Sequence, residues 1–390
     1  MMLKDLLKND FSGEILEDAF TRGRYATDAS IYQMMPAAVA IPRSKEDISA
    51  ALTAARQVGM SVTGRGGGTS QCGQTVNSGL ILDNSEHFNK ILDIDVAGRR
   101  AIVQPGVVLD ELNKVLKPHG LWFPVDISTA SRATIGGMAA NNSCGGRSLR
   151  YGTMRTNVLG VEAILADGTL ARFGEMPDMK GPFHPAQAII DEMMQIGSAH
   201  SDLIEARFPK LNRRVGGYNL DALVPGDSPN NLSHLLVGSE GTLAYFTEVE
   251  LKLSPLVGER VLAVCHFADF HQAMNATQHL VALKPLSVEL VDNTMIALSR
   301  QIPMFRRTIE AFVEGAPAAL LLVEFDEGSA DANARKLRET EGCMGSLGFA
   351  WSGTGARWGG VKPITDQRLQ GQIAEVRKSG LNIMMSMKQD

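Results

Sequence analysis

The chain contains 390 residues, which is enough for two domains and a large hydrophobic core. Apolar residues make up 44% and charged residues 21% of the sequence, as in an ordinary soluble enzyme. The net charge of −5 argues against nucleic acid as a partner. The longest apolar run, residues 318–323, is too short to cross a bilayer, and the acidic N-terminus is unlike a signal peptide. We therefore expect a cytoplasmic protein with no transmembrane segment, and we leave peripheral attachment to the inner membrane open.

The first part of the chain predicts a mixture of helices and strands. Residues 1–35 form an amphipathic pattern that predicts a helical preface. Ser44-Lys-Glu-Asp resembles a capping box that opens a helix to about Gly59. The next segments predict a helix over 109–116, which ends at Pro118 and Gly120, and two strands over 159–165 and 170–173, which are joined by an Asp167-Gly168 turn. The pattern then predicts a helix over 185–205 and two strands over 234–238 and 243–253, which are joined by Ser239-Glu-Gly. This order is α+β and not a regular βαβ alternation.

After residue 256 the pattern restarts. The predicted strands are residues 261–265, 287–291 and 319–325, and the predicted helices are residues 269–283 and 293–312. We therefore expect a first domain over residues 36–256 and a second α+β domain over residues 257–390.

The most informative stretch is the glycine-rich loop at residues 64–74, Gly-Arg-Gly-Gly-Gly-Thr-Ser-Gln-Cys-Gly-Gln. Glycine adopts positive φ without steric cost, so this backbone can turn its N–H groups toward an anion, and we expect positive φ at Gly67. Neither a Walker loop nor a G-x-G-x-x-G fingerprint is spelled here. Two interpretations remain, a loop that binds a phosphate or pyrophosphate and a tight surface turn.

A second glycine-rich segment, residues 120–153, favours the binding interpretation. Its Thr134-Ile-Gly-Gly start predicts a helix N-terminus, where free N–H groups favour negative charge. Asn141, Asn142 and Ser143 add donors and acceptors that can contact a heteroaromatic ring. Two such segments in one chain are a poor match to a loop-rich β-structure with incidental glycines.

Six motifs in order resemble those of one flavoprotein superfamily: Arg65-Gly-Gly-Gly-Thr-Ser, Phe123-Pro-Val-Asp, Thr134-Ile-Gly-Gly, Asn141-Asn-Ser, Arg150-Tyr-Gly-Thr and Gly238-Ser-Glu-Gly-Thr-Leu. They resemble the FAD-binding domain of the vanillyl-alcohol oxidase / p-cresol methylhydroxylase (PCMH) superfamily. Within it, the chain is most similar to the FAD-linked 2-hydroxy acid dehydrogenases, which include glycolate oxidase flavoprotein subunit, D-lactate dehydrogenase and D-2-hydroxyglutarate dehydrogenase. The resemblance implies an α+β fold: a PCMH-type FAD-binding domain of two α+β subdomains, then an incomplete substrate domain of the FAD-linked oxidase C-terminal type.

The same resemblance implies which residues contact the FAD. They are Arg65, Gly66, Gly67, Gly68, Thr69, Ser70, Gln74, Pro124, Asp126, Thr134, Gly136, Gly137, Asn141, Ser143, Gly145, Tyr151, Val161, Glu240, Gly241 and Thr242. No histidine occupies the positions beside either glycine-rich segment that carry covalent flavin in some members of the superfamily, so we expect non-covalent FAD.

The resemblance also implies Arg377 and Lys388 as the cations that hold a substrate carboxylate, although their spacing is shorter than in the D-2-hydroxyglutarate branch. The family's His-x-Gly-Asp-Gly-Asn motif does not occur before Asp390. We therefore expect an N-terminal fragment whose catalytic base lies beyond this residue. Such a form should bind flavin but oxidise 2-hydroxy acids poorly.

The expected function is FAD-dependent oxidation of a D-2-hydroxy acid, such as D-lactate, glycolate or D-2-hydroxyglutarate, to the 2-oxo acid by hydride transfer to flavin N5. The alternatives are another flavoenzyme of the same fold and an FAD-binding module without turnover in this form. The resemblance implies an electron acceptor, which is a quinone, a cytochrome or an electron-transfer protein, and we allow for a homodimer.

The cysteines and histidines suggest no metal chemistry. None of the four cysteines forms a C-x-x-C pair, and the eight histidines include no H-x-x-x-H pair. We therefore expect reduced thiols and no metal site.

Overall fold

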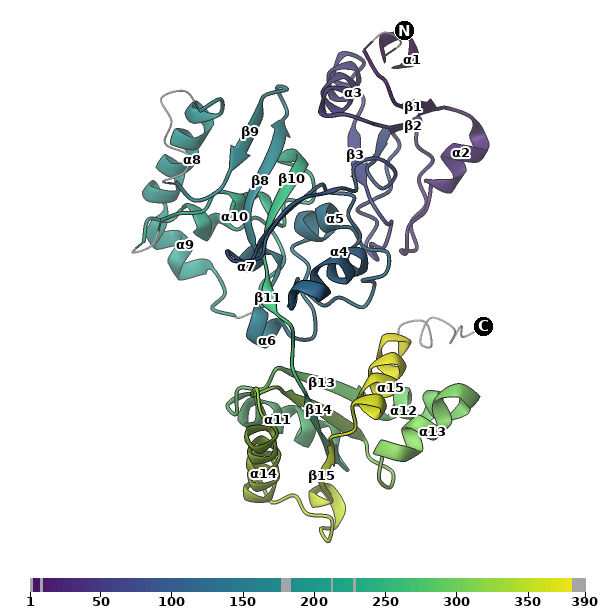
Figure 1. The fold of residues 1–390 in the computed structure, drawn as a ribbon, viewed down its shortest axis with the longest axis vertical. Helices are drawn as coiled ribbons and strands as arrows, with labels where there is room; N and C mark the ends of the chain where they lie inside the picture. The colour runs from purple at the N-terminus through teal and green to yellow at the C-terminus, as the bar shows by residue number, and fades with distance from the viewer. Residues whose placement is uncertain (1–2, 8–9, 177–183, 212, 227–228, 381–390) are drawn as a thin grey trace. The chain divides into compact units, whose positions relative to one another are not determined.

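The computed structural model describes residues 3–7, 10–176, 184–211, 213–226 and 229–380 (Figure 1). The chain forms two compact units. The first comprises Met1–Gly145 and Tyr151–Leu256, and the second comprises Gly146–Arg150 and Val257–Asp390. Both units combine helices with sheets, so the expected α+β class is confirmed.

The first unit begins with a four-stranded sheet in the order β1-β2-β4-β3. Its strands are β1 (Glu14–Leu16), β2 (Ala38–Ile41), β3 (Val62–Arg65) and β4 (Leu80–Asp83), and helix α3 (Lys45–Gln57) packs on it. Ser44 caps α3 by accepting a hydrogen bond from the N–H of Asp47, as the capping box predicts. Residues 1–35 contain two short helices, α1 (Leu3–Leu7) and α2 (Ala19–Arg24), and also the edge strand β1.

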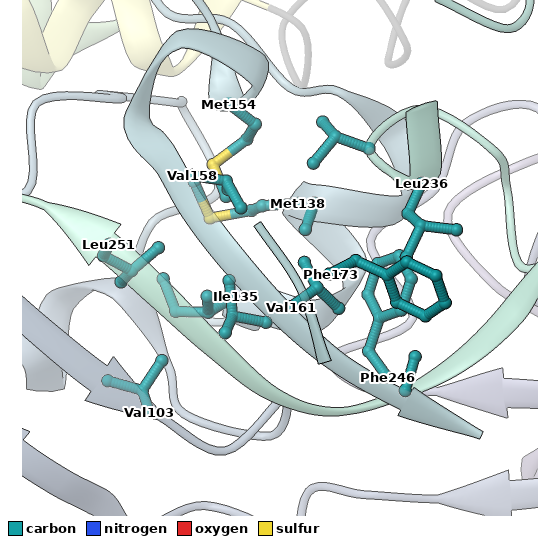
Figure 2. Close-up of a cluster of buried hydrophobic side chains, with 14 of the residues drawn as sticks. Val103, Ile135, Met138, Met154, Val158, Val161, Phe173, Leu236, Phe246 and Leu251 are labelled. Atoms are coloured by element: carbon teal, nitrogen blue, oxygen red, sulfur yellow. The ribbon is translucent and has the colours of Figure 1, made fainter. Parts of the chain in front are cut away.

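The second sheet of this unit is antiparallel, in the order β5-β6-β10-β8-β9. Its strands are β5 (Ile91–Asp95), β6 (Arg100–Val103), β8 (Val158–Leu165), β9 (Leu170–Phe173) and β10 (Ala244–Lys252). Figure 2 shows Ile135 and Met138 of helix α5 (Ile135–Asn141) among core side chains of these strands, such as Val158 and Leu251. The predicted strands over 159–165 and 170–173 and the turn between them are confirmed, with Gly168 at φ 95°.

The first unit contains further helices and two short strands. They are α4 (Leu109–Leu116), η1 (Lys117–His119), β7 (Leu121–Trp122), α7 (Met154–Asn157), α8 (Gln187–Ala199), α9 (Ser201–Arg207), η3 (Leu220–Leu223), α10 (Ser233–Leu236) and β11 (Ser254–Pro255), which pairs with β7. Helix α6 (Ser148–Tyr151) begins in the short stretch that belongs to the second unit. Helix α4 ends as predicted, with Gly120 in the left-handed region at φ 70°.

One predicted strand is wrong. Residues 233–236 form α10, where a strand over 234–238 was expected. The side-chain oxygen of Asn231 accepts hydrogen bonds from the N–H (2.9 Å) and hydroxyl (2.6 Å) of Ser233, and these bonds start the helical turn. A short apolar run cannot distinguish a strand from a buried helical turn. The Ser239-Glu-Gly turn therefore follows a helix and does not close a hairpin.

Lys45 joins the two sheets of the first unit. Its ammonium group pairs with Glu162 of β8 and, at 2.6 Å, with Glu248 of β10. Burial lowers the Lys45 pKa, but the bonds to the two carboxylates outweigh burial and leave it raised. The contact fixes the start of α3 to the five-stranded sheet.

The second unit is a four-stranded antiparallel sheet covered on both faces (Figure 1). Its order is β13 (Ser287–Asp292), β14 (Ala319–Phe325), β12 (Val261–Phe267) and β15 (Gly359–Ile364). The core on one face contains side chains of α11 (Phe270–Val281) and α14 (Ala330–Ser346). The core on the other face contains side chains of α12 (Asn293–Gln301), α13 (Pro303–Phe312) and α15 (Gln367–Lys378). The short helix η4 (Gly355–Arg357) precedes β15. The elements predicted for residues 261–325 are present, except that the helix expected over 293–312 is divided at Ile302 into α12 and α13, because Pro303 begins a second helix.

His266 is a buried polar residue in the middle of this sheet. Its Nδ1 lies 3.0 Å from the Val264 carbonyl oxygen, and its Nε2 accepts a hydrogen bond from the N–H of Glu314 at 3.0 Å. Only the neutral ring with a proton on Nδ1 satisfies both contacts. Burial lowers the pKa of His266 from 6.5 to about 4.

This shift predicts a loss of stability in mild acid. The unfolded chain takes up a proton near pH 6.5 and the folded chain only near pH 4, so the free energy of unfolding should fall between these values, by up to roughly 3 kcal/mol. His266→Gln should be less stable than wild type at pH 7.5, and this difference should shrink toward pH 4.5. Urea unfolding followed by tryptophan fluorescence measures it, with His271→Gln at an exposed position as the control. A difference that is independent of pH would contradict the prediction.

Candidate functional site

The glycine-rich loop lies directly against the second glycine-rich segment. Gly66 packs on the side chain of Thr134, and Gly67 packs on the carbonyl oxygen of Arg132. A Cβ atom at either glycine would overlap these atoms. The two segments that the sequence singled out therefore meet through contacts that only glycine allows.

The backbone of the loop differs from expectation in one respect. The residues with positive φ are Gly68, at 61°, and Gly73, at 80°, so the expectation for Gly67 is wrong. Gly68 also accepts a hydrogen bond from the N–H of Ala29 through its carbonyl oxygen at 3.2 Å. Gly67 is required because of its close approach to Arg132, and Gly68 because of its dihedral angle.

The side chain of Arg65 supports this loop from within. Its guanidinium donates to the carbonyl oxygens of Tyr25 (3.0 Å), Thr27 (2.7 Å) and Thr75 (3.3 Å) and lies 5.3 Å from the centre of the Tyr25 ring. Burial lowers the pKa of Arg65, and the charges of Asp28 and Asp83 oppose that effect. The observed role of this guanidinium is thus to hold residues 25–27 and 75 around the loop.

Helix α5 begins at Thr134, as the Thr-Ile-Gly-Gly pattern predicts, but its first N–H groups are not free. The N–H of Ile135 donates to the Val107 carbonyl and that of Gly136 to the Pro105 carbonyl, both at 2.8 Å. The backbone also forms a bridge between Val108 and Thr134. The expectation of free N–H groups is therefore wrong for Ile135 and Gly136, because a neighbouring strand-like segment has already paired with them.

A chain of side-chain hydrogen bonds links the glycine-rich loop to the Gly238–Thr242 turn. Ser70 donates to the side-chain oxygen of Gln74, and Gln74 bonds to the carboxylate of Glu240. Partial burial raises the pKa of Glu240, and the bond from Gln74 opposes this rise. Three residues predicted from two separate motifs thus lie together.

The Gly238–Thr242 turn has an unusual backbone. Gly238, Glu240 and Gly241 have φ of 84°, 54° and 74°. Positive φ is unfavourable for glutamate by about 1–3 kcal/mol, and such strain is concentrated at functional sites. The hydroxyl of Thr242 lies 2.7 Å from that of Tyr218, and the Cα of Gly241 faces open space. The turn therefore presents small and polar groups toward solvent.

The other predicted cofactor residues fall into two groups. Asp126 lies against Gly145, Asn141 donates to the Ser143 hydroxyl at 3.0 Å, and the Tyr151 ring meets the Trp122 ring edge-on at 5.4 Å. In contrast, Pro124 and Val161 are buried, and Val161 is part of the hydrophobic core. The side chain of Val161 therefore contributes to packing and offers no surface to a ligand.

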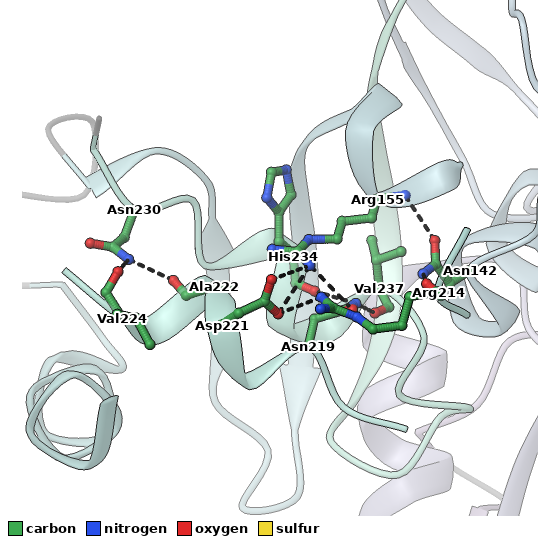
Figure 3. Close-up of polar contacts among 10 residues, drawn as sticks. All are labelled: Asn142, Arg155, Arg214, Asn219, Asp221, Ala222, Val224, Asn230, His234 and Val237. Atoms are coloured by element: carbon green, nitrogen blue, oxygen red, sulfur yellow. Dashed lines mark hydrogen bonds and ion pairs between the residues drawn. The ribbon is translucent and has the colours of Figure 1, made fainter. Parts of the chain in front are cut away.

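A partly buried polar network behind the turn was not predicted (Figure 3). Asp221 accepts hydrogen bonds from Arg155 (2.8 Å) and Arg214 (2.7 Å), and Asn142 and Asn219 bond to the same segments. Burial raises the Asp221 pKa, but the bonds from the two arginines outweigh it and hold the pKa below its usual range. The sequence drew attention to Asn142 only as a ring contact, and no local pattern marks Asn219 or Asp221, because their partners are distant in the chain.

In the second unit, Arg377 of α15 forms an ion pair with Glu289 of β13. Both side chains lie against Gly146, which follows directly on the predicted cofactor residue Gly145. Lys388, the other predicted carboxylate ligand, is outside the described residues. Arg377 is thus a paired cation beside Gly146, which belongs to the second glycine-rich segment.

One group of metal-compatible side chains lies outside these segments in the described part of the chain. Ligand atoms of Glu14, Glu86 and His87 lie within 4.8 Å of one another. The two glutamates are exposed, and Glu14 also pairs with Arg43 at 3.5 Å. Exposed acidic groups commonly gather in this way without an ion, so the group carries no assignment.

Comparison with known proteins identifies both parts of the chain. Residues 36–174 match the family of FAD binding domains, and residues 258–387 match the C-terminal domain of FAD linked oxidases. The chain therefore combines an FAD binding domain with the C-terminal domain of FAD linked oxidases. The family indicates FAD as the cofactor.

Curated relatives of this flavoprotein include dehydrogenases of 2-hydroxy acids. It is 35% identical over 347 residues to D-2-hydroxyglutarate dehydrogenase of Pseudomonas putida, which covers 85% of this chain and 34% of the relative. It is 32% identical over 301 residues to glycolate oxidase subunit GlcD of Bacillus subtilis (75% and 54%), and 29% identical over 306 residues to D-lactate dehydrogenase of Archaeoglobus fulgidus (78% and 57%). The chain thus spans about a third of the first relative and just over half of the other two.

The fold also matches a solved structure. Alkyldihydroxyacetonephosphate synthase superposes with a TM-score of 0.66 at 17% identity, over 98% of this chain and 64% of that one. At this identity the match establishes a shared fold only. In the described residues, no helix is long and apolar enough to span a membrane.

The residues of the first unit fit a dinucleotide cofactor. Gly66 and Gly67 let the loop pack directly on Thr134 and Arg132, and Gly241 faces open space. Ser70, Gln74 and Thr242 add hydroxyl and amide groups that can bond to phosphate or to a flavin ring. Such a set of backbone and neutral polar groups is suited to a pyrophosphate and a heteroaromatic ring.

The contact between the two glycine-rich segments predicts that Gly67→Val abolishes FAD binding. The valine side chain would overlap the Arg132 carbonyl and push the loop away from residues 132–134. Fluorescence titration of the apoprotein with FAD measures the binding, and circular dichroism checks the fold. Gly216→Val, at a position with open space around it, is the matched control. Full flavin occupancy in the folded Gly67→Val variant would show that this loop is only a surface turn.

Proposed function

We propose that this flavoprotein oxidises a D-2-hydroxy acid to the corresponding 2-oxo acid. The observation that supports this most is that the predicted cofactor residues of the loop and the turn meet at α5. The curated relatives of the chain include dehydrogenases of D-2-hydroxyglutarate and D-lactate. When bound, FAD supplies a ring that accepts a hydride at N5. The protein's part is to hold the cofactor, orient the substrate and remove the hydroxyl proton.

In this proposal the two glycine-rich segments and the Gly238–Thr242 turn hold the cofactor. Backbone groups of Gly66–Thr69 lie at the pyrophosphate, and the linked Ser70, Gln74 and Glu240 side chains keep the loop and the turn together. Partial burial raises the pKa of Glu240, which disfavours the negative charge that would repel an anionic ligand. No residue in the described ranges is assigned as the general base.

Arg377 is the proposed ligand of the substrate carboxylate. Its pairing with Glu289 fixes the guanidinium, whose planar fork can bond to two carboxylate oxygens. The location beside Gly146 supports this role, because the chain reaches Gly146 directly from the predicted cofactor residue Gly145.

The proposed binding is non-covalent, because no histidine occupies the sequence positions that carry covalent flavin in the superfamily. Precipitation of the purified flavoprotein with acid should release all of the yellow flavin to the supernatant, as measured by absorbance of the two fractions. Flavin that stays with the washed pellet would contradict non-covalent attachment.

Anaerobic spectrophotometry tests the proposed reaction. Addition of D-2-hydroxyglutarate or D-lactate to the FAD-loaded protein should bleach the flavin absorbance, and the L-enantiomers should not. The test is whether the D-acids bleach the flavin and the L-enantiomers do not, whatever the rate of bleaching. Arg377→Gln should raise the concentration of acid needed for half-maximal bleaching at least about tenfold, whereas Arg368→Gln, an exposed arginine of the same helix, should not change it. Bound flavin that none of the D-acids bleaches would favour an FAD-binding module without turnover.

A further inference from the structure

The Gly238–Thr242 turn is held from behind by two buried asparagines. It follows the four-residue helix α10, and three of its five residues have positive φ. Two of its N–H groups bond to the end of α5: that of Gly238 to the Ala139 carbonyl (2.9 Å) and that of Glu240 to the Ala140 carbonyl (3.0 Å). Further support comes from side chains outside the turn.

Asn219 fixes the residues that lead into the turn. It is 3% exposed, and its amide nitrogen donates to the carbonyl oxygens of His234 (3.1 Å) and Val237 (2.9 Å). Its amide oxygen accepts a hydrogen bond from Arg155 at 3.4 Å. An amide is required here, because the groups on one side are acceptors and the group on the other side is a donor.

Asn142 supports the same turn from the end of α5. It is 1% exposed and takes the left-handed conformation, with φ 49°, that ends the helix. Its amide oxygen accepts from the N–H of Arg155 at 3.0 Å, and its nitrogen donates to the Arg214 carbonyl at 3.3 Å. A Cβ atom at Gly238 would lie 3.1 Å from the Cβ of Asn142, so the turn rests directly on this side chain.

Asp221 fixes the two arginines that contact the asparagines. Its carboxylate binds the guanidinium groups of Arg155 and Arg214, and each of these arginines also contacts Asn142 (Figure 3). Hydrogen bonds to both the oxygen and the nitrogen thereby fix the orientation of each asparagine side-chain amide. The whole network lies in the first unit.

We propose that Asn142 and Asn219 are positioning residues for the cofactor, which act by holding the Gly238–Thr242 turn in its binding conformation. This inference rests on the proposed function, because it assumes that FAD occupies the site to which Glu240 and Thr242 belong. The asparagines are buried and act through the turn, not by contact with FAD.

The physical argument is one of pre-organisation. Without the Asn219 amide, the His234 and Val237 carbonyls lose a buried donor, and the turn samples other conformations. The apparent affinity for FAD then falls in proportion to the fraction of molecules with the turn formed. A residue with a merely structural role would lower the thermal stability without this selective loss of affinity.

Asn230 supplies a matched control in the same region. Its amide nitrogen also donates to two backbone carbonyls, those of Ala222 (2.7 Å) and Val224 (2.9 Å), but none of these bonds reaches the turn (Figure 3). Asn219→Ala and Asn230→Ala therefore remove the same kind of interaction. A second test variant, Asn142→Gly, removes the amide while keeping a residue that tolerates positive φ.

The experiment measures the FAD dissociation constant by fluorescence titration, the melting temperature of each apoprotein and the visible circular dichroism of the bound flavin. Asn219→Ala and Asn142→Gly should bind FAD at least about tenfold more weakly than Asn230→Ala and change the visible spectrum. Equal FAD affinity in test and control variants would overturn the inference. If Asn219→Ala does not fold, Asn142→Gly decides the question. Wild type that does not bind FAD would instead refute the proposed function.

Discussion

Helix α5 is the element on which the candidate cofactor site depends. Thr134, at its start, packs against Gly66 of the glycine-rich loop, and the carbonyls of Ala139 and Ala140, at its end, accept hydrogen bonds from the Gly238–Thr242 turn. Its apolar side chains, Ile135 and Met138, are buried in the main core. This seven-residue helix therefore joins two segments that are far apart in the sequence, and the core fixes where they meet.

Three arginines near the candidate residues of the first unit are already paired. The guanidinium of Arg65 is bonded to backbone carbonyls, and Arg155 and Arg214 share Asp221. Backbone and neutral groups of this unit could give a bound pyrophosphate directional contacts. Glu240 fits this arrangement, because partial burial disfavours its charged form.

The second unit depends on a different type of contact. Glu324 of β14 is paired with Arg147 (2.9 Å) and Arg260 (2.8 Å). Burial raises its pKa, but the two arginines outweigh that effect and hold it below its usual range. Arg147 belongs to Gly146–Arg150, the short stretch that lies in this unit although the residues on either side of it belong to the first. The continuity of the second glycine-rich segment in sequence therefore conceals a change of unit.

The sequence by itself determined the class of fold, the glycine-rich segments and most elements, because periodicity, capping residues such as Ser44 and glycine-specific backbone are local properties. It failed at residues 234–238, where the bonds from Asn231 to Ser233 favour a helix, and at Gly67, where the constraint is contact with Arg132. Only the tertiary structure paired the N–H groups of Ile135 and Gly136, placed Val161 in the core and assembled Asn142, Asn219 and Asp221 behind the turn. The physical reason is that hydrogen bonds between residues distant in the chain leave no periodic pattern in the sequence. These contacts decide which glycines and amides lie at the candidate site and which only support it.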